Sequence, residues 1–281
     1  MLGAIAGDII GSVYEGKKQW LGTRTATFQP LFSPKARFTD DTVLTVAVAD
    51  ALLHGGDLVS LLKDYFARYP GSGFGGDFKA WAASEETEPY GSWGNGSAMR
   101  VSPVAWVFDT LEEVLHRAKD TARVTHNHPE GIKGAQATAA AIFLARSGGT
   151  KWELRDEVER RFHYDLSFTL DEIRPTYAFD SSCQGTVPQA IVAFLESSDF
   201  ESAVRLAVSL GGDCDTLACI AGGIAAAFYG GVPGHIREQT LARLDEPLFE
   251  VVAEFEGRYP ESARRAELDA AMNKKDQSRK E

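Results

Sequence analysis

The sequence has 281 residues, of which 44% are hydrophobic and 10% aromatic, enough to form one large globular domain or two modest ones. Its 29 basic and 40 acidic residues give a formal net charge of −11 at pH 7. This charge argues against non-specific binding to nucleic acids and to anionic membrane surfaces. We therefore expect neither a membrane partner nor direct sequence-specific nucleic-acid binding.

The cysteines and the apolar stretches bear on cellular location. Cys183, Cys214 and Cys219 lack the spacing of a zinc site, and three cysteines cannot all pair with one another. Asp8 places a charge where the apolar segment of a secretory signal would lie. The longest apolar stretch, Leu217 to Tyr229, is too short to span a bilayer. These features predict a cytoplasmic protein.

Helical periodicity begins at the N-terminus. Gly3, Gly7 and Gly11 share the four-residue spacing of one helix face. Glycine within a helix costs about 1 kcal/mol relative to alanine, so its repetition predicts a close approach between helix backbones. An apolar stripe from Val43 to Leu52 predicts a second helix, which should end near the glycine pair at positions 55 and 56.

Helical patterns also dominate the second half of the chain. They occur at Gly131 to Arg146, an alanine-rich run, and then at Val187 to Phe194 and Ala203 to Leu210. After the acidic cluster at positions 213–216, Ala218, Gly222 and Ala226 repeat the four-residue spacing of small residues. The alternation typical of β-strands is hard to find. We therefore predict an all-α fold whose loops carry the chemistry.

The domain organisation is predicted to be simple. No linker or change in composition divides the chain, so we expect a single compact domain over residues 1–265. The last residues, 266–281, are rich in charge and are expected to form a disordered, solvated tail.

Two short acidic clusters are the most informative motifs. Thr39-Asp40-Asp41-Thr42 and Asp213-Cys214-Asp215-Thr216 each combine carboxylates with a hydroxyl and precede an apolar helix. Grouping four carboxylates is unfavourable unless a cation lies among them. An all-oxygen ligand set suits Mg²⁺, Mn²⁺ or Ca²⁺ rather than zinc, and two ions are the simplest interpretation.

Helix capping is the alternative interpretation of these clusters. Asp and Thr are common N-caps, and either cluster alone is more typical of a helix start than of a ligand set. Capping requires one side-chain acceptor, however, and each cluster supplies at least three. The same surplus at two positions favours metal binding.

Three further segments are candidates for the site. The loop from Gly91 to Arg100 contains three glycines and small polar residues, which suits close approach of a phosphate or ribose, although an ordinary tight loop would look similar. Arg100 could make a phosphate contact or a structural salt bridge, and the structural role is favoured. Thr125-His126-Asn127-His128-Pro129 precedes a helix, so His126 could contact a ligand or the segment could simply cap that helix. Glu15, at the apparent end of the first helix, is notable only together with the other motifs.

The order of these motifs resembles the ADP-ribosylglycohydrolase family. The resemblance is carried by five segments from the N-terminus to about Gly231: Gly7-Asp8 with Glu15, Phe38 to Thr42, Gly94 to Arg100, Thr125-His126, and Gly211 to Thr216. It implies an orthogonal helical bundle with a dinuclear Mg²⁺ or Mn²⁺ centre in a cleft. One departure is Cys214, which stands where threonine is commoner.

The resemblance also implies residue roles. The metal ligands would be Thr39, Asp40, Asp41, Asp213, Asp215 and Thr216; the catalytic residues Glu15, Asp40 and Asp215; and the substrate-binding residues Asn95, Gly96, Ser97, Met99 and His126. Cleavage at an anomeric carbon requires a stabilised oxocarbenium-like transition state, a positioned water and a protonated leaving group. Which carboxylate acts as acid and which as base stays open.

The predicted function is hydrolysis of the bond between ADP-ribose and a modified protein side chain, with arginine as the expected acceptor. The partner would be an ADP-ribosylated protein or another ADP-ribose conjugate, and we expect a monomer. One alternative is a dinuclear phosphohydrolase acting on a nucleotide-like substrate, although no βαβ pattern supports it. Another is a non-catalytic ADP-ribose-binding or structural protein.

Overall fold

The computed structural model describes residues 1–16 and 25–260, and these ranges are helical. Their only extended pairing is an isolated antiparallel bridge between Gly94 and Ser182. Buried apolar side chains from the first helix to the last form one continuous core. The predicted all-α single domain is therefore confirmed, whereas the predicted tail at 266–281 lies outside the described residues.

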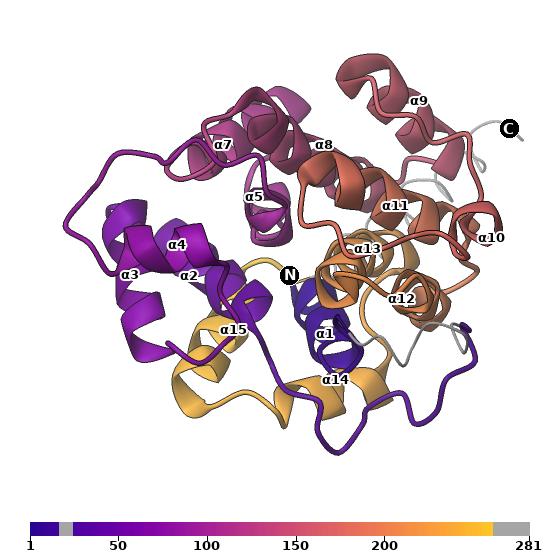
Figure 1. Ribbon diagram of the computed structural model, residues 1–281, viewed down its shortest axis with the longest axis horizontal. Coiled ribbons are helices and arrows are strands. Elements are labelled where there is room, and N and C mark those ends of the chain that lie inside the picture. Colours follow the sequence, from indigo (N-terminus) through magenta and orange to yellow (C-terminus); the bar gives the residue numbers. More distant parts are fainter. Residues whose placement is uncertain (17–24, 261–281) are drawn as a thin grey trace, which may run out of the picture.

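The helices can be followed along the chain in Figure 1. They are α1 (Leu2–Gly11), α2 (Asp40–His54), α3 (Leu58–Arg68), α4 (Gly76–Ala82), α5 (Gly96–Met99), α6 (Val104–Val107), α7 (Leu111–Arg123), α8 (Pro129–Arg146), α9 (Lys151–Phe162), α10 (Leu170–Ile173), α11 (Cys183–Glu196), α12 (Phe200–Ser209), α13 (Cys214–Tyr229), α14 (Gly234–Leu241) and α15 (Glu246–Arg258). The helical segments predicted from periodicity correspond to α1, α2, α8, α11, α12 and α13. Each of them is confirmed.

Helices α1 and α13 pack against each other at the centre of the molecule (Figure 1). The glycine face of α1 meets the small-residue face of α13. A β-carbon added to Gly3 would lie 2.3 Å from the Gly222 carbonyl oxygen, and one added to Gly7 would lie 1.9 Å from that of Ala218. The close backbone approach expected from the glycine spacing is therefore confirmed, and all ten residues of α1 are buried.

Replacing Gly7 with alanine is expected to destabilise the protein by about 3 kcal/mol or more. The new methyl group would meet backbone atoms of α13, and two packed helices can relieve such an overlap only by moving apart. Urea unfolding would measure the loss. The matched control is Gly257→Ala on α15, where an added β-carbon meets nothing within 4 Å and should stabilise the helix by up to about 1 kcal/mol. Equal destabilisation by the two changes would contradict this account of the α1–α13 contact.

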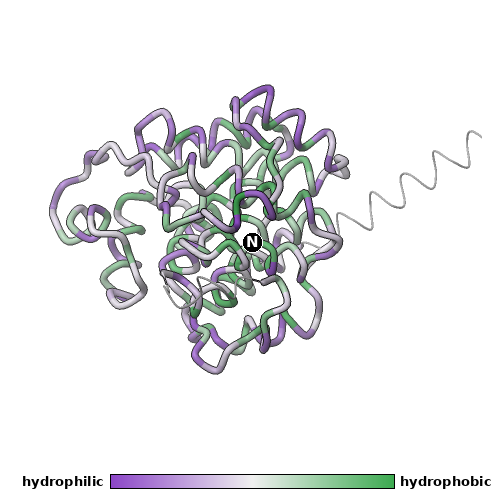
Figure 2. Tube along the Cα trace, turned by 45° about the vertical axis from the view of Figure 1, so that its right-hand side comes forward, coloured by the Kyte–Doolittle hydropathy of each residue, from purple (hydrophilic) through white to green (hydrophobic). Residues whose placement is uncertain are grey.

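The apolar residues gather inside the bundle, while polar residues predominate on its outer turns (Figure 2). Within residues 1–16 and 25–260, no helix combines the length and the apolar content needed to cross a membrane. Helices α7, α9 and α15 were not predicted from periodicity. Each begins at a side-chain cap, formed by Thr110, Thr150 and Asp245 respectively.

Candidate active site

The two acidic clusters meet because three helix ends converge. Asp8, near the C-terminal end of α1, accepts hydrogen bonds from the Thr39 backbone nitrogen at 2.9 Å and from the Thr39 hydroxyl at 2.6 Å. It also accepts from the backbone nitrogen of Thr42 at 3.1 Å and from the Thr42 hydroxyl. A β-carbon on Gly11 would lie 2.5 Å from the Asp215 α-carbon, so the start of α13 packs directly on the end of α1.

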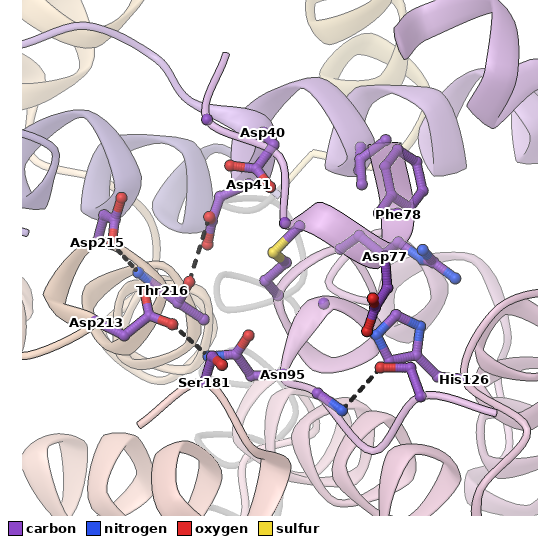
Figure 3. Close-up of a pocket in the computed structure, with 18 of the residues that line it drawn as sticks. Asp40, Asp41, Asp77, Phe78, Asn95, His126, Ser181, Asp213, Asp215 and Thr216 are labelled. Carbon is purple, nitrogen blue, oxygen red and sulfur yellow. Dashed lines mark hydrogen bonds between the residues drawn. The ribbon is translucent and has the colours of Figure 1, made fainter. Parts of the chain in front are cut away.

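Two overlapping groups of carboxylates result. Asp8, Asp41 and Asp215 each offer one oxygen, and these oxygens lie within 4.8 Å of one another. Glu15, Asp213 and Asp215 form a second such group, so Asp215 belongs to both. Figure 3 shows the side chains of Asp41, Asp213 and Asp215 gathered on one side of the cleft. The two acidic clusters therefore meet in space, although Asp41 and Thr216 are 175 residues apart in the sequence.

The electrostatics of the cluster are unfavourable for its own carboxylates. Burial raises the pKa of Asp40 to about 8, with a further increase from the charge of Asp8. Burial also places the pKa values of Asp41 and Asp215 well above the ordinary range, and neighbouring carboxylates raise them further. Ionising all these groups near neutral pH requires a compensating positive charge.

The residues present fit divalent cations. The Asp41 oxygen Oδ1 is buried and has no hydrogen-bond partner, which leaves it available as a ligand. Every group in the two carboxylate clusters offers oxygen, the ligand type preferred by Mg²⁺, Mn²⁺ and Ca²⁺. The acidic cluster can therefore hold metal ions.

Capping accounts for little of the second cluster. Asp213 is the N-cap residue of α13, yet its side chain makes no capping hydrogen bond. Instead, its Oδ2 accepts from the Asn95 amide nitrogen at 2.7 Å (Figure 3). In the first cluster the Thr39 hydroxyl accepts from the Asp41 backbone nitrogen only at 3.4 Å. Ligand binding therefore remains the better interpretation of the surplus carboxylates.

The clusters form one end of a cleft of about 340 Å³. Of the predicted site residues, ten line this cleft: Glu15, Asp40, Asp41, Asn95, Gly96, Met99, His126, Asp213, Asp215 and Thr216. Thr39 and Ser97 do not. The Thr39 hydroxyl donates to Asp8, and the buried Ser97 hydroxyl donates to the Gly131 carbonyl at 2.7 Å.

Several predicted residues support other members of the site. Asn95 donates through its side-chain nitrogen to both Asp213 and Thr186, so that nitrogen holds the acidic cluster in place. The Thr216 hydroxyl donates to Asp41 Oδ2 at 3.3 Å, which links the two clusters directly. Asp40 lines the cleft but lies outside the two close groups of carboxylates.

The glycine-rich turn contributes space more than free amides. The Gly94 nitrogen donates to the Ser92 hydroxyl at 3.0 Å, and the Asn95 nitrogen donates to the Ser181 carbonyl at 2.8 Å. A side chain at Gly96 would approach the ring of His126, at 3.1 Å from its Nε2. Glycine at this position therefore keeps that ring nitrogen open to the cleft.

Arg100 lines the cleft, and its side chain is held by uncharged acceptors rather than by the salt bridge considered from the sequence. Its Nη2 donates to the Thr121 carbonyl at 2.9 Å and to the Thr125 hydroxyl at 2.8 Å, and the side chain is fully buried. Within the described ranges it pairs with no carboxylate.

Sequence reasoning did not assign the residues Asp8, Asp77, Tyr90 and Phe179 to the site. Asp8 belongs to the acidic cluster, and the other three line the cleft. The available signal for Asp8 was its position as the only charge in an otherwise apolar, glycine-faced helix. The other three lie in or beside loops, where no periodicity marks them.

The protein is therefore an all-helical domain with a cleft suited to divalent cations. Oxygen ligands from several helix ends gather in this cleft beside a glycine-rich turn. The family model described as ADP-ribosylglycohydrolase matches residues 1–267. The chain belongs to the ADP-ribosylglycohydrolase family, and this membership supports ADP-ribosyl hydrolysis as its reaction.

Individual relatives agree with this assignment. The chain is 27% identical over 305 residues to "ADP-ribosylhydrolase ARH3" of Homo sapiens, covering 82% of this chain and 84% of that protein. It is 30% identical over 177 residues to "ADP-ribosylarginine hydrolase Tri1" of Pseudomonas putida, covering 56% and 46% respectively. A solved structure titled "ADP-ribosylglycohydrolase-related protein complex" superposes with a TM-score of 0.66 at 25% identity, over 93% of this chain and 97% of the other.

Proposed function

We propose that the protein is a metal-dependent hydrolase that cleaves the glycosidic bond between ADP-ribose and a modified arginine side chain of a protein. The observation that carries the proposal is the convergence of Glu15, Asp41, Asp213 and Asp215 at one end of a cleft that also contains a glycine-rich turn. The first feature suits bond cleavage at a ribose, and the second suits the rest of a nucleotide-like ligand.

Two Mg²⁺ or Mn²⁺ ions are the proposed cofactors. Asp40, Asp41, Asp213, Asp215 and the hydroxyl of Thr216 would hold them, and Thr39 is also proposed as a ligand. When bound, such ions orient a ribose diol and lower the pKa of water. Asp8 adds a seventh group, which sequence reasoning left out of the ligand set.

The protein's own residues supply proton transfer and orientation. Burial raises the pKa of Glu15, and the charge of Asp213 raises it further. A carboxyl with a raised pKa can carry a proton near neutral pH and then release it, as protonation of a glycosidic leaving group requires. Glu15 is therefore proposed as a catalytic group, with Asp40 and Asp215 as the other candidates for proton transfer.

The remainder of the cleft is proposed to bind the ADP-ribose portion. Gly96 and Met99 line its wall, and His126 presents a ring nitrogen beside the glycine-rich turn. Asn95 and Ser97 would act mainly by holding this wall, because their side chains already donate to Asp213 and to the Gly131 carbonyl.

ADP-ribose is expected to inhibit competitively and about a hundredfold or more better than ribose. Two charge-assisted hydrogen bonds to a diphosphate would account for a difference of that size. Inhibition constants from initial rates would measure the ratio. Equal inhibition by ADP-ribose and ribose would remove the glycine-rich turn and His126 from the ligand site.

The acceptor residue is tested by a panel of ADP-ribosylated substrates. The Pseudomonas putida relative is named for ADP-ribosylarginine hydrolysis, which supports arginine, so release of free ADP-ribose should be fastest from ADP-ribosylarginine. Faster release from a serine linkage would overturn the proposed acceptor but keep the reaction. Cleavage of phosphate esters alone would instead favour the phosphohydrolase alternative, and tight binding without release would favour a non-catalytic binder.

A further inference from the structure

His126 is held by a chain of two hydrogen bonds that begins at a buried cation. Arg100 Nη2 lies 2.8 Å from the Thr125 hydroxyl oxygen, and that oxygen lies 2.7 Å from His126 Nδ1. Arg100 and Thr125 are fully buried, and His126 is only 4% exposed. The second proton of Nη2 is directed to the Thr121 carbonyl at 2.9 Å, so both of its protons have acceptors.

The direction of this chain follows from the donor inventory. A guanidinium can only donate, so the Thr125 oxygen accepts from Arg100 and keeps its own proton for another acceptor. His126 Nδ1 is the acceptor that the structure places within reach of that proton. Had Nδ1 carried a proton instead, the buried threonine proton would lose its partner, which is unfavourable inside a protein.

The other ring nitrogen of His126 faces the glycine-rich turn. A β-carbon on Gly96 would lie 3.1 Å from Nε2, and one on Gly94 would lie 3.6 Å away. His126 lines the cleft, and Figure 3 shows its side chain on the opposite side of the cleft from Asp213 and Asp215. Thus Nε2 points to the space in which a ligand would bind.

We propose that Arg100 and Thr125 are positioning residues that fix His126 as the neutral Nε2–H tautomer, so that Nε2 donates a hydrogen bond to an oxygen of the bound ligand. That the ligand oxygen belongs to the phosphate or ribose of ADP-ribose rests on the proposed function. The tautomer itself follows from the buried hydrogen-bond chain alone.

The charges around the ring agree with a neutral histidine. Burial lowers the pKa of His126 well below its ordinary value, and the positive charge of Arg100 lowers it further. Burial also lowers the pKa of Arg100, to about 10, so the guanidinium stays charged at neutral pH. Tyr90 packs beside the imidazole with ring centroids 5.9 Å apart and supplies no anion at that pH, because burial raises its own pKa to about 12.

Nitrogen-15 NMR of the histidine side chains tests the proposal directly. The full-length parent should show His126 as a single neutral tautomer at pH 7, with Nδ1 unprotonated and Nε2 protonated; a His126→Gln variant assigns the signals among the six histidines. Thr125→Val removes the hydroxyl at nearly constant shape and should allow His126 to populate both neutral tautomers. Thr125→Ser retains the hydroxyl and should keep the parental pattern.

Binding supplies the second measurement. Thr125→Val should weaken ADP-ribose binding about tenfold, the size of one hydrogen bond of about 1.4 kcal/mol, whereas Thr125→Ser should stay within about twofold. A parent protein with Nδ1–H or charged His126 overturns the proposal even if the valine variant does not fold. Unchanged tautomer and affinity in a folded Thr125→Val protein would also overturn it. A fixed Nε2–H tautomer in a parent that does not bind ADP-ribose would reject the proposed function and keep the roles of Arg100 and Thr125 in fixing the tautomer.

Discussion

Asp215→Asn is expected to lower turnover at least about a hundredfold and to abolish the thermal stabilisation that Mg²⁺ or Mn²⁺ confers on the parent. Asp215 belongs to both close groups of carboxylates, so its loss removes a ligand oxygen from each. The asparagine keeps the shape of the side chain and removes one buried negative charge. The metal-free variant should therefore be at least as stable as the metal-free parent, which separates loss of metal binding from loss of folding.

The matched control is Asp156→Asn on the exposed surface of α9, which should leave both turnover and metal response unchanged. Differential scanning calorimetry with and without metal would measure the stabilisation. A full metal-linked rise in Tm in the Asp215→Asn protein would mean that the cation site lies elsewhere.

The same cluster sets the pH dependence of the metal-free protein. Because the folded state raises the pKa of Asp40 from 3.8 to about 8, it binds more protons than the unfolded state between these values. Stability should then fall as pH rises through this window. In chelator the Tm of the parent should decrease from pH 5 to pH 8, and added metal should flatten the decrease. A Tm that does not change with pH in chelator would contradict the described electrostatics.

Glu15→Gln is expected to reduce turnover by about 10²- to 10⁴-fold, the usual contribution of general acid or base catalysis. The glutamine keeps the size and hydrogen bonding of Glu15 but cannot exchange a proton. Affinity for ADP-ribose should stay within about tenfold of the parent, or about 1.4 kcal/mol. Steady-state kinetics and calorimetric titration with ADP-ribose would separate the two effects.

The control for this change is Glu250→Gln, an exposed position on α15. It should leave turnover and binding unchanged. Near-normal turnover in a folded Glu15→Gln protein would assign the proton transfers to the aspartates of the cluster.

The central helices could be predicted from the sequence because their close packing requires small residues at a regular spacing. Gly7 and Gly222 are required where two backbones touch, and that requirement appears as a four-residue spacing. Two of the helices that periodicity missed, α7 and α9, lie at the surface, where one face is solvated and buried residues are few, whereas α5 and α6 are buried but only four residues long. The starts of α7 and α9 were nevertheless encoded in caps, such as Thr150 with Glu153 in a reciprocal capping box.

The site was predictable in its chemistry but not in its supporting bonds. The surplus of carboxylates predicted that the two clusters would act together, and residues 39–42 and 213–216 do meet. Asp8 was part of the family motif, but it was not assigned to the ligand set because it is a single carboxylate rather than a member of an acidic cluster. The hydrogen bond from Asn95 to Asp213 joins residues 118 positions apart in the sequence. Such a contact depends on the tertiary structure, so no local pattern predicts it.

The most direct measurement is the turnover of an ADP-ribosylated arginine substrate by metal-stripped protein before and after Mg²⁺ or Mn²⁺ is restored. We expect no release of ADP-ribose above the Asp215→Asn background in chelator and full recovery on addition of either active ion. Undiminished turnover in chelator, by protein shown to contain no metal, would contradict the proposal that these carboxylates work by holding cations.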